Sequence, residues 1–275
     1  MSDRVIKAVL FDLGETVLNF GKVDTTSLFH EGARLSYDYL KSIGQQLGNF
    51  PWYKWRNLTA IRLRYTLSNI IGNDFDSLEL LKKIGIRAGY KISDEQWQHM
   101  VWLWYEPLSK AARIEDDITE TLKELRDSGL KLGIVSNTFI NGLALDKHLE
   151  QAGLIEYFPL RLYSYQFDFR KPDQRIFQKA ASQIGEDMEN IMFIGDRIDN
   201  DVSPAIQAGM KAVLKRTAGN TDKTLPNLAH EVKLLAELPE LIRRINSENR
   251  EDIADTERMA PGNNAEQQTE PVRSI

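Results

Sequence analysis

Four short stretches of this sequence carry carboxylate, hydroxyl, amide or ammonium groups just after an apolar run or in a nearby loop. They are Phe11-Asp12-Leu13-Gly14, Val135-Ser136-Asn137, Arg170-Lys171-Pro172 and Gly195-Asp196 with Asp201 close behind. Transfer of a phosphoryl group needs a nucleophile, charge neutralisation and positioning, and these side chains can supply all three. Each stretch alone is also explained by a turn, a cap or a solvated charge. Their occurrence together, in this order, indicates a site.

The apolar runs before these groups have the pattern of buried strands. Such runs occupy residues 5–11, 130–135, 160–165, 191–194 and 211–215, and a further short strand is expected near Val232. From residue 118 onward, segments with one apolar helical face alternate with the strands. This alternation predicts a parallel sheet covered by helices on both faces. The strand ends of such a sheet converge on one edge, which brings the four stretches together.

A long segment without strand patterns, residues 20–112, separates the first strand from the others. It predicts helices over about 26–47, 51–71 and 75–89, and a fourth that begins near Ser93. In the fourth, Trp97, Met100 and Trp104 fall on one helical face and are expected to form a core. We therefore predict an α/β fold with a Rossmann-like, doubly wound parallel core made of residues 1–19 and 113–245. An all-α cap of residues 20–112 is inserted after strand 1.

Composition narrows the class of protein. Hydrophobic residues make up 42% and charged residues 27% of the chain, and the absence of cysteine excludes disulfides and thiolate metal sites. The net charge of −5, without a basic face, argues against a nucleic-acid partner. No signal-peptide pattern and no apolar run of ~20 residues is present, so we expect a cytoplasmic protein with no membrane partner. Residues 246–275 carry seven acidic and three basic side chains and predict a disordered acidic tail.

The motifs resemble those of the haloacid dehalogenase-like hydrolase superfamily, in members with a helical cap inserted after the first core strand. The resemblance rests on Phe11-Asp12-Leu13-Gly14-Glu15-Thr16, Val135-Ser136-Asn137-Thr138, Arg170-Lys171-Pro172-Asp173 and Gly195-Asp196-Arg197-Ile198-Asp199-Asn200-Asp201. It covers about residues 5–18 and 113–245. The cap contributes little to it.

The resemblance implies Mg²⁺-dependent hydrolysis of a small phosphorylated metabolite through an aspartyl-phosphate. Asp12 is expected to be the nucleophile, and Lys171 to offset the negative charge around it. The phosphoryl oxygens would be bound by Ser136 and Asn137. The expected magnesium ligands are Asp12, the backbone carbonyl of Gly14, Asp196 and Asp201, the last of these through water or from behind the other ligands.

One position departs from the superfamily pattern. Phosphatases of this superfamily usually carry a second aspartate two residues after the nucleophile, where this chain has Gly14. A general acid typically contributes ~10² to 10⁴ in rate, or roughly 3–5 kcal/mol. Three explanations remain open: Glu15 or a cap residue replaces the acid, the substrate has a good leaving group such as an acyl or aryl phosphate, or turnover is weak.

Two other functions therefore also remain open. A 2-haloacid dehalogenase uses an aspartate nucleophile without the second aspartate, although it would need no metal and would not keep the acidic cluster at residues 196–201. A weakly active or non-catalytic phosphate-binding or regulatory protein is the second alternative, because a fold does not guarantee turnover.

Overall fold

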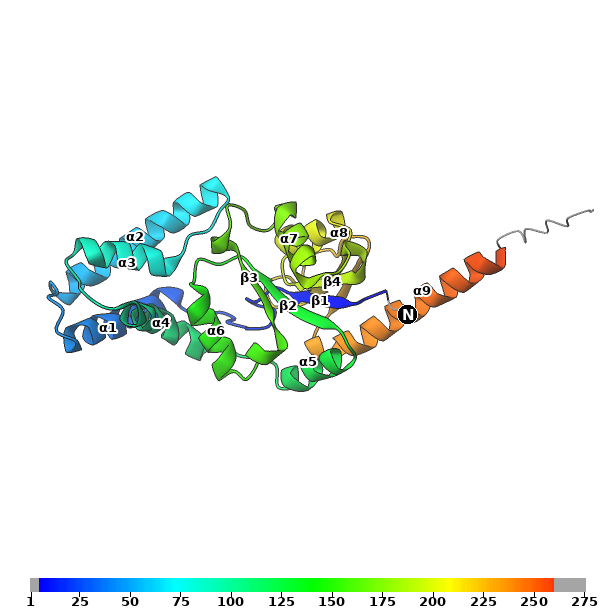
Figure 1. Cartoon of the computed structure of the whole chain (residues 1–275), viewed down its shortest axis with the longest axis horizontal. Helices are drawn as coiled ribbons and strands as arrows, with labels where there is room; N and C mark the ends of the chain where they lie inside the picture. The colour runs from blue at the N-terminus through cyan, green and yellow to red at the C-terminus, as the bar shows by residue number, and fades with distance from the viewer. Residues whose placement is uncertain (1–4, 260–275) are drawn as a thin grey trace, which may run out of the picture.

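A six-stranded parallel sheet forms the centre of the computed structural model, which describes residues 5–259, with side chains up to residue 248 (Figure 1). The strand order is β3-β2-β1-β4-β5-β6. The strands are β1 (Ala8–Phe11), β2 (Lys131–Ser136), β3 (Leu160–Tyr163), β4 (Ile191–Gly195), β5 (Lys211–Lys215) and β6 (Ala229–Val232). The predicted doubly wound α/β fold is confirmed, including the strand near Val232.

Helices cover both faces of the sheet because successive side chains of each strand point to opposite sides. Val9 and Phe11 of β1 pack in one apolar core with three helices that lie against the sheet and with Trp102 and Tyr105 of a fourth, whereas Ala8 and Leu10 pack in a second core with two others. The first set is α5 (Ile118–Asp127), α6 (Gly142–Gln151) and α9 (Leu238–Met259), and the second is α7 (Gln174–Ile184) and α8 (Ser203–Gln207). Single-turn helices lie at Ile155–Tyr157, Ser164–Gln166, Met188–Asn190 and Leu235–Glu237.

The strand order reverses at β1. After β1 the chain builds β2 and β3 on one side and then returns to place β4 on the other side. Phe11 is in register with Ile134 of β2 and Ile194 of β4. Doubly wound sheets bind ligands at such a reversal, beyond the carboxyl ends of the strands. The residues that follow β1 and β4 therefore lie at this position.

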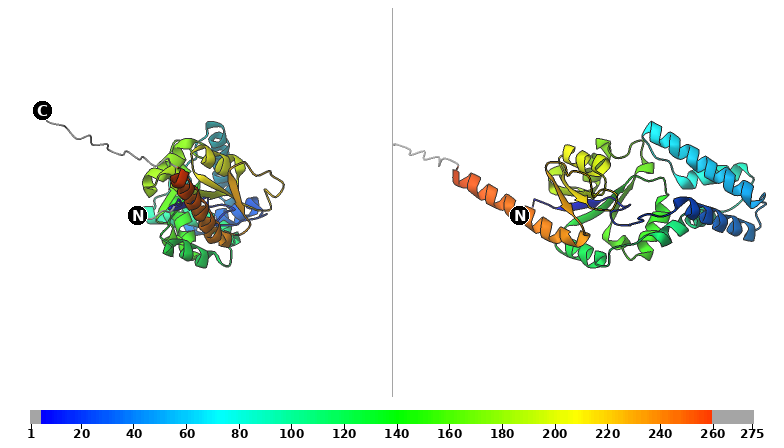
Figure 2. Two further views of the ribbon diagram at one scale, coloured as in Figure 1. Left: turned by 90° about the vertical axis from the view of Figure 1, so that its right-hand side faces the viewer. Right: turned by 180° about the vertical axis from the view of Figure 1, so that it is seen from behind.

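Four helices between β1 and β2 form a group at one end of the molecule (Figures 1 and 2). They are α1 (Thr25–Ser42), α2 (Phe50–Ile71), α3 (Ser77–Arg87) and α4 (Asp94–Ala111). Ser93 begins α4 with a capping box, as its position suggests. Trp97, Met100 and Trp104 are buried in the core of this group, which confirms the prediction that this face of the fourth helix forms a core.

The chain leaves the sheet for these helices and returns to it at adjacent points. Asn19 and Arg113 exchange two backbone hydrogen bonds, each 2.7 Å long. This pairing places the two connections between the sheet and the helical group side by side. The exact division into a core of residues 1–19 and 113–245 and a cap of residues 20–112 stays a prediction.

The end of the chain differs in part from the prediction. Disorder was expected from residue 246, but α9 continues to Met259. This stretch is rich in residues with good helix propensity and contains no glycine or proline before Pro261. The rest of the predicted tail, residues 260–275, lies outside the described residues. Within residues 5–259 no helix is long and apolar enough to cross a membrane.

Candidate active site

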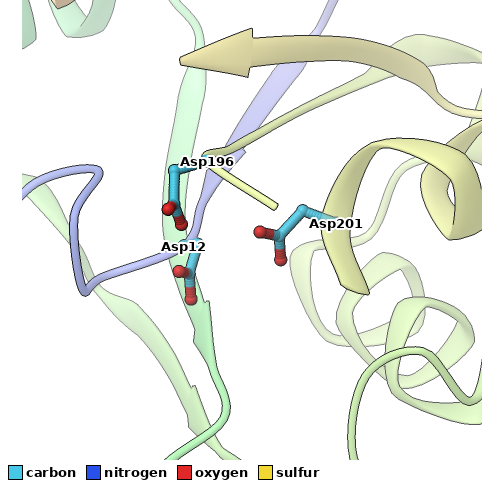
Figure 3. Close-up of side chains that lie close together, drawn as sticks. All are labelled: Asp12, Asp196 and Asp201. Carbon is cyan, nitrogen blue, oxygen red and sulfur yellow. The ribbon is translucent and has the colours of Figure 1, made fainter. Parts of the chain in front are cut away.

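Three carboxylates meet at the reversal of the strand order (Figure 3). Asp12 follows β1, Asp196 follows β4, and Asp201 lies in a π-helical turn, Ile198–Val202, that leads into α8. Each offers one oxygen, and these oxygens lie within 4.8 Å of one another. The Asp12 side chain is 13% exposed and that of Asp201 is 1% exposed, so the cluster is reached from the Asp12 side.

Local backbone contacts hold these carboxylates in place. The N–H of Asp12 donates to the carbonyl of Ile194 at 2.8 Å, which continues the pairing of β1 with β4. Asp201 closes its own turn, because its N–H donates to the Arg197 carbonyl and its Oδ2 accepts from the Arg197 N–H. A Cβ at Gly195 would lie 2.4 Å from the Asp201 side chain. Glycine is therefore required at the end of β4 for Asp201 to approach.

Lys171 joins two of the three carboxylates. Its Nζ lies 2.7 Å from Asp12 Oδ1 and 2.6 Å from Asp201 Oδ1, and its side chain is only 2% exposed. Burial alone would lower the pKa of this ammonium group, but the charges of Asp12 and Asp201 outweigh burial and raise it. Lys171 is therefore a fixed positive charge beside Asp12.

The cluster still carries excess negative charge. Burial, with repulsion from Asp12 and Asp201, raises the pKa of Asp196 to about 7. Burial also raises the pKa of Asp201, against the opposing effect of Lys171. A raised carboxyl pKa means that the surroundings disfavour a further negative charge. One lysine does not balance three carboxylates, so the site favours an additional cation.

The two residues expected to bind phosphoryl oxygens differ in their surroundings. Ser136 ends β2 and is buried, and its hydroxyl makes no hydrogen bond among the side chains described up to residue 248. The amide of Asn137 is engaged with the backbone of Lys171, to which it donates at 2.7 Å and from which it accepts at 2.9 Å. Asn137 therefore positions Lys171, a function that the sequence did not suggest.

The loop after β1 contains Gly14 and Glu15, whose surroundings differ. A Cβ at Gly14 would meet no atom within 4 Å, and no hydrogen bond from residues 5–259 reaches the Gly14 carbonyl oxygen. Glu15 adopts a positive φ of 56°, and its carboxylate accepts hydrogen bonds from the N–H groups of Phe20 and Gly21. The Glu15 side chain thus closes the loop, which argues against its use as the replacement acid.

Other residues support the site without any signal in the sequence. The amide of Asn220, which is 1% exposed, donates to the carbonyls of Asp196 and Lys215 and so fixes the loop after β4. Asp74, between α2 and α3, forms an ion pair of 2.7 Å with Arg170, the neighbour of Lys171. Only the tertiary structure reveals the contacts of Asn220 with Asp196 and of Asp74 with Arg170, because each joins segments far apart in the chain.

Comparison with known proteins agrees with this geometry. Residues 6–209 match the family model described as haloacid dehalogenase-like hydrolase. The glyceraldehyde 3-phosphate phosphatase of Methanopyrus kandleri is 28% identical over 211 residues, which cover 76% of this chain and 83% of that protein. The phosphoglycolate phosphatase of Agrobacterium fabrum is 34% identical over 116 residues, covering 42% and 48% of the two chains.

Solved structures give the same fold. A HAD phosphatase from Thermococcus onnurineus matches with a TM-score of 0.55 at 22% identity, over 86% of this chain and 98% of that one. A 2-haloacid dehalogenase from Pseudomonas syringae matches with a TM-score of 0.53 at 24% identity, over 87% and 99%. At these identities the structures support the fold alone. The family model spans most of the chain and includes Asp12, Lys171 and Asp196, so this chain belongs to the haloacid dehalogenase-like hydrolases.

Proposed function

We propose that this hydrolase cleaves phosphate monoesters through an aspartyl-phosphate formed on Asp12, with Mg²⁺ as cofactor. The observation that carries the proposal is the cluster of Asp12, Asp196 and Asp201 with Lys171 bonded to Asp12. A fixed cation beside a partly exposed carboxylate suits attack on an anionic phosphoryl group.

The donor set fits Mg²⁺. The ion prefers oxygen ligands in an octahedral arrangement, commonly one or two carboxylates with waters. Asp12 and Asp196 supply carboxylates, and the Gly14 carbonyl has no competing hydrogen bond among the described residues. Asp201, already paired with Lys171, would support them from behind or through a water. When bound, Mg²⁺ would neutralise charge on the phosphoryl oxygens.

The chain's own residues supply the nucleophile and the groups that position it, and protons are exchanged with water. The carboxylate of Asp12 forms a bond to phosphorus, and the bond from phosphorus to the leaving oxygen breaks with its electron pair. Lys171 holds Asp12 in place and offsets the charge that accumulates. The Ser136 hydroxyl can donate to a phosphoryl oxygen. A water then attacks phosphorus, which frees the Asp12 carboxylate and releases inorganic phosphate.

Relatives support this class of reaction. Those from Methanopyrus kandleri and Agrobacterium fabrum are named as phosphatases of glyceraldehyde 3-phosphate and of phosphoglycolate, both small phosphorylated metabolites. A small phosphorylated substrate is therefore proposed here too. The dehalogenase alternative is less well supported, because three adjacent carboxylates repel one another unless a cation joins them.

A panel of phosphate esters and a small 2-haloacid, each with and without Mg²⁺, tests the proposal. Phosphate release that requires Mg²⁺ and is lost in Asp12→Asn is the expected result. Halide release without Mg²⁺ would establish the dehalogenase function instead. Binding of Mg²⁺ and phosphate without turnover of any ester would support the non-catalytic alternative, which Gly14 keeps open.

A further inference from the structure

We propose that the substrates are aryl phosphate monoesters, whose aromatic ring occupies a cavity between α1 and α2 while phosphate lies at Asp12. This inference rests on the proposed phosphatase function and specifies its substrate class. Two independent observations support it: the lining of the cavity and the missing side chain at Gly14.

The cavity has a volume of about 350 Å³. This volume is in the range typical of small-molecule sites, roughly 300–1,000 Å³. Its lining residues are mainly aromatic and aliphatic: Thr25, Thr26, Phe29, Leu58, Ile61, Arg62, Tyr65 and Phe139. Arg62 is the one charged member of this set, and it makes no ion pair within the part of the chain whose side chains are described. Because most of the lining side chains are aromatic or aliphatic, an apolar ring suits the cavity better than a sugar or a polyol.

Two aromatic residues lie between this cavity and the loops of the proposed active site. Tyr65 and Phe139 line both this cavity and a larger one of about 850 Å³ that is also lined by Asn137 and Lys171. Phe139 directly follows the Ser136-Asn137-Thr138 motif. Its ring stacks on Phe75 at 5.1 Å and meets the Tyr65 ring edge-on at 5.7 Å. In the proposed complex, the organic group of a phosphate ester held by the motif extends past the Phe139 ring into the cavity.

The chemistry of the leaving group points to the same class. When Asp12 bonds to phosphorus, the bond to the ester oxygen breaks and its electron pair leaves on that oxygen. Gly14 has no side chain to protonate it. A phenolic hydroxyl has a pKa of ~10, far below that of an aliphatic alcohol, so an aryl oxygen can depart as the phenolate and take its proton from water later. The carboxylate of an acyl phosphate also leaves readily, but a small acyl group would not fill an aromatic cavity.

The test compares phenyl phosphate, glycerol 3-phosphate and acetyl phosphate with Mg²⁺, using the full chain and two variants. Thr26→Trp fills the cavity from an exposed position on its wall. Thr59→Trp is the matched control, because Thr59 is exposed on α2 and does not line the cavity. Thermal unfolding of both variants shows whether each is folded.

We expect wild-type kcat/KM for phenyl phosphate to exceed that for glycerol 3-phosphate by at least about 10²-fold, the usual value of a general acid. Thr26→Trp should lower kcat/KM for phenyl phosphate by at least about tenfold, a typical effect of losing apolar contacts in a pocket. It should leave acetyl phosphate unchanged, and Thr59→Trp should change neither substrate.

Other outcomes would overturn the inference. Equal turnover of the phenyl and glycerol esters, or an equal loss on acetyl phosphate in Thr26→Trp, would show that the cavity does not select aryl groups. These results leave the proposed phosphatase function intact. Failure to release phosphate from all three substrates would count against the proposed function itself.

Discussion

Replacing Gly14 by aspartate should supply a general acid two residues after Asp12, where the chain now has no side chain. Gly14 is two residues after Asp12, its φ is not in the left-handed region, and a Cβ there would meet no atom within 4 Å. The backbone conformation and the space around Cβ therefore both allow a side chain at this position. Because the magnesium ligand proposed at this position is the backbone carbonyl, Gly14→Asp leaves that ligand unchanged.

The size of the gain depends on the leaving group. A positioned general acid contributes ~10² to 10⁴ in rate, so kcat/KM for an alkyl phosphate should rise by at least about 10²-fold. Each factor of ten is about 1.4 kcal/mol of barrier, so the gain is at least about 3 kcal/mol. An aryl phosphate should gain less than about tenfold, because a phenolate departs without a proton. The neighbouring Asp12, Asp196 and Asp201 should help keep the introduced carboxyl protonated, as like charges disfavour ionisation.

Phosphate release from glycerol 3-phosphate and from phenyl phosphate, measured with Mg²⁺, is the assay. Gly14→Asn is the matched control, since it adds nearly the same shape without an acidic proton. The argument requires a gain for aspartate and none for asparagine, and the gain should decline as pH rises above the pKa of the new acid. A folded Gly14→Asp protein with no gain on the alkyl ester would refute it and would show that another acid already acts.

Three further predictions concern charge pairs and buried groups. Lys171→Met should reduce turnover by more than about 10³-fold, because Asp12 and Asp201 lose the ammonium group that pairs with both. It should also lower the free energy of unfolding by ~3–5 kcal/mol in urea titrations. Unchanged stability would contradict the pairing. Burial lowers the pKa of His148 to about 4, so only the unfolded chain binds this proton between pH 6.5 and 4. Wild-type stability should therefore fall by up to about 3 kcal/mol across that range relative to His148→Gln, and parallel pH profiles would refute this. Arg170→Leu should destabilise the protein by about 3 kcal/mol, because the buried Asp74 carboxylate loses its ion-pair partner. Adding Asp74→Asn should recover much of the loss. Additive losses in the double-mutant cycle would exclude the coupling.

The sequence determined the fold and the chemical types in the site, because both depend on local patterns. Short apolar runs that end at Asp12, Ser136 and Asp196 indicate strands because they are brief, bounded by turn residues and alternate with helical segments. The carboxyl ends of parallel strands share one edge, so these residues had to lie close together once the strands were recognised. The periodicity of the segment between β1 and β2 likewise predicted its helices.

The tertiary structure alone decided how these groups are paired. Lys171 lies between Asp12 and Asp201, although 159 residues separate it from Asp12. The amide of Asn137 turns to the Lys171 backbone, and Glu15 turns to the N–H groups of the loop that it closes. Side-chain directions in loops follow from backbone dihedrals, such as the positive φ of Glu15, and from contacts with distant segments. No local pattern encodes these contacts, so the sequence supplied the chemical groups and only the folded chain determined which of them lie together and which are already paired.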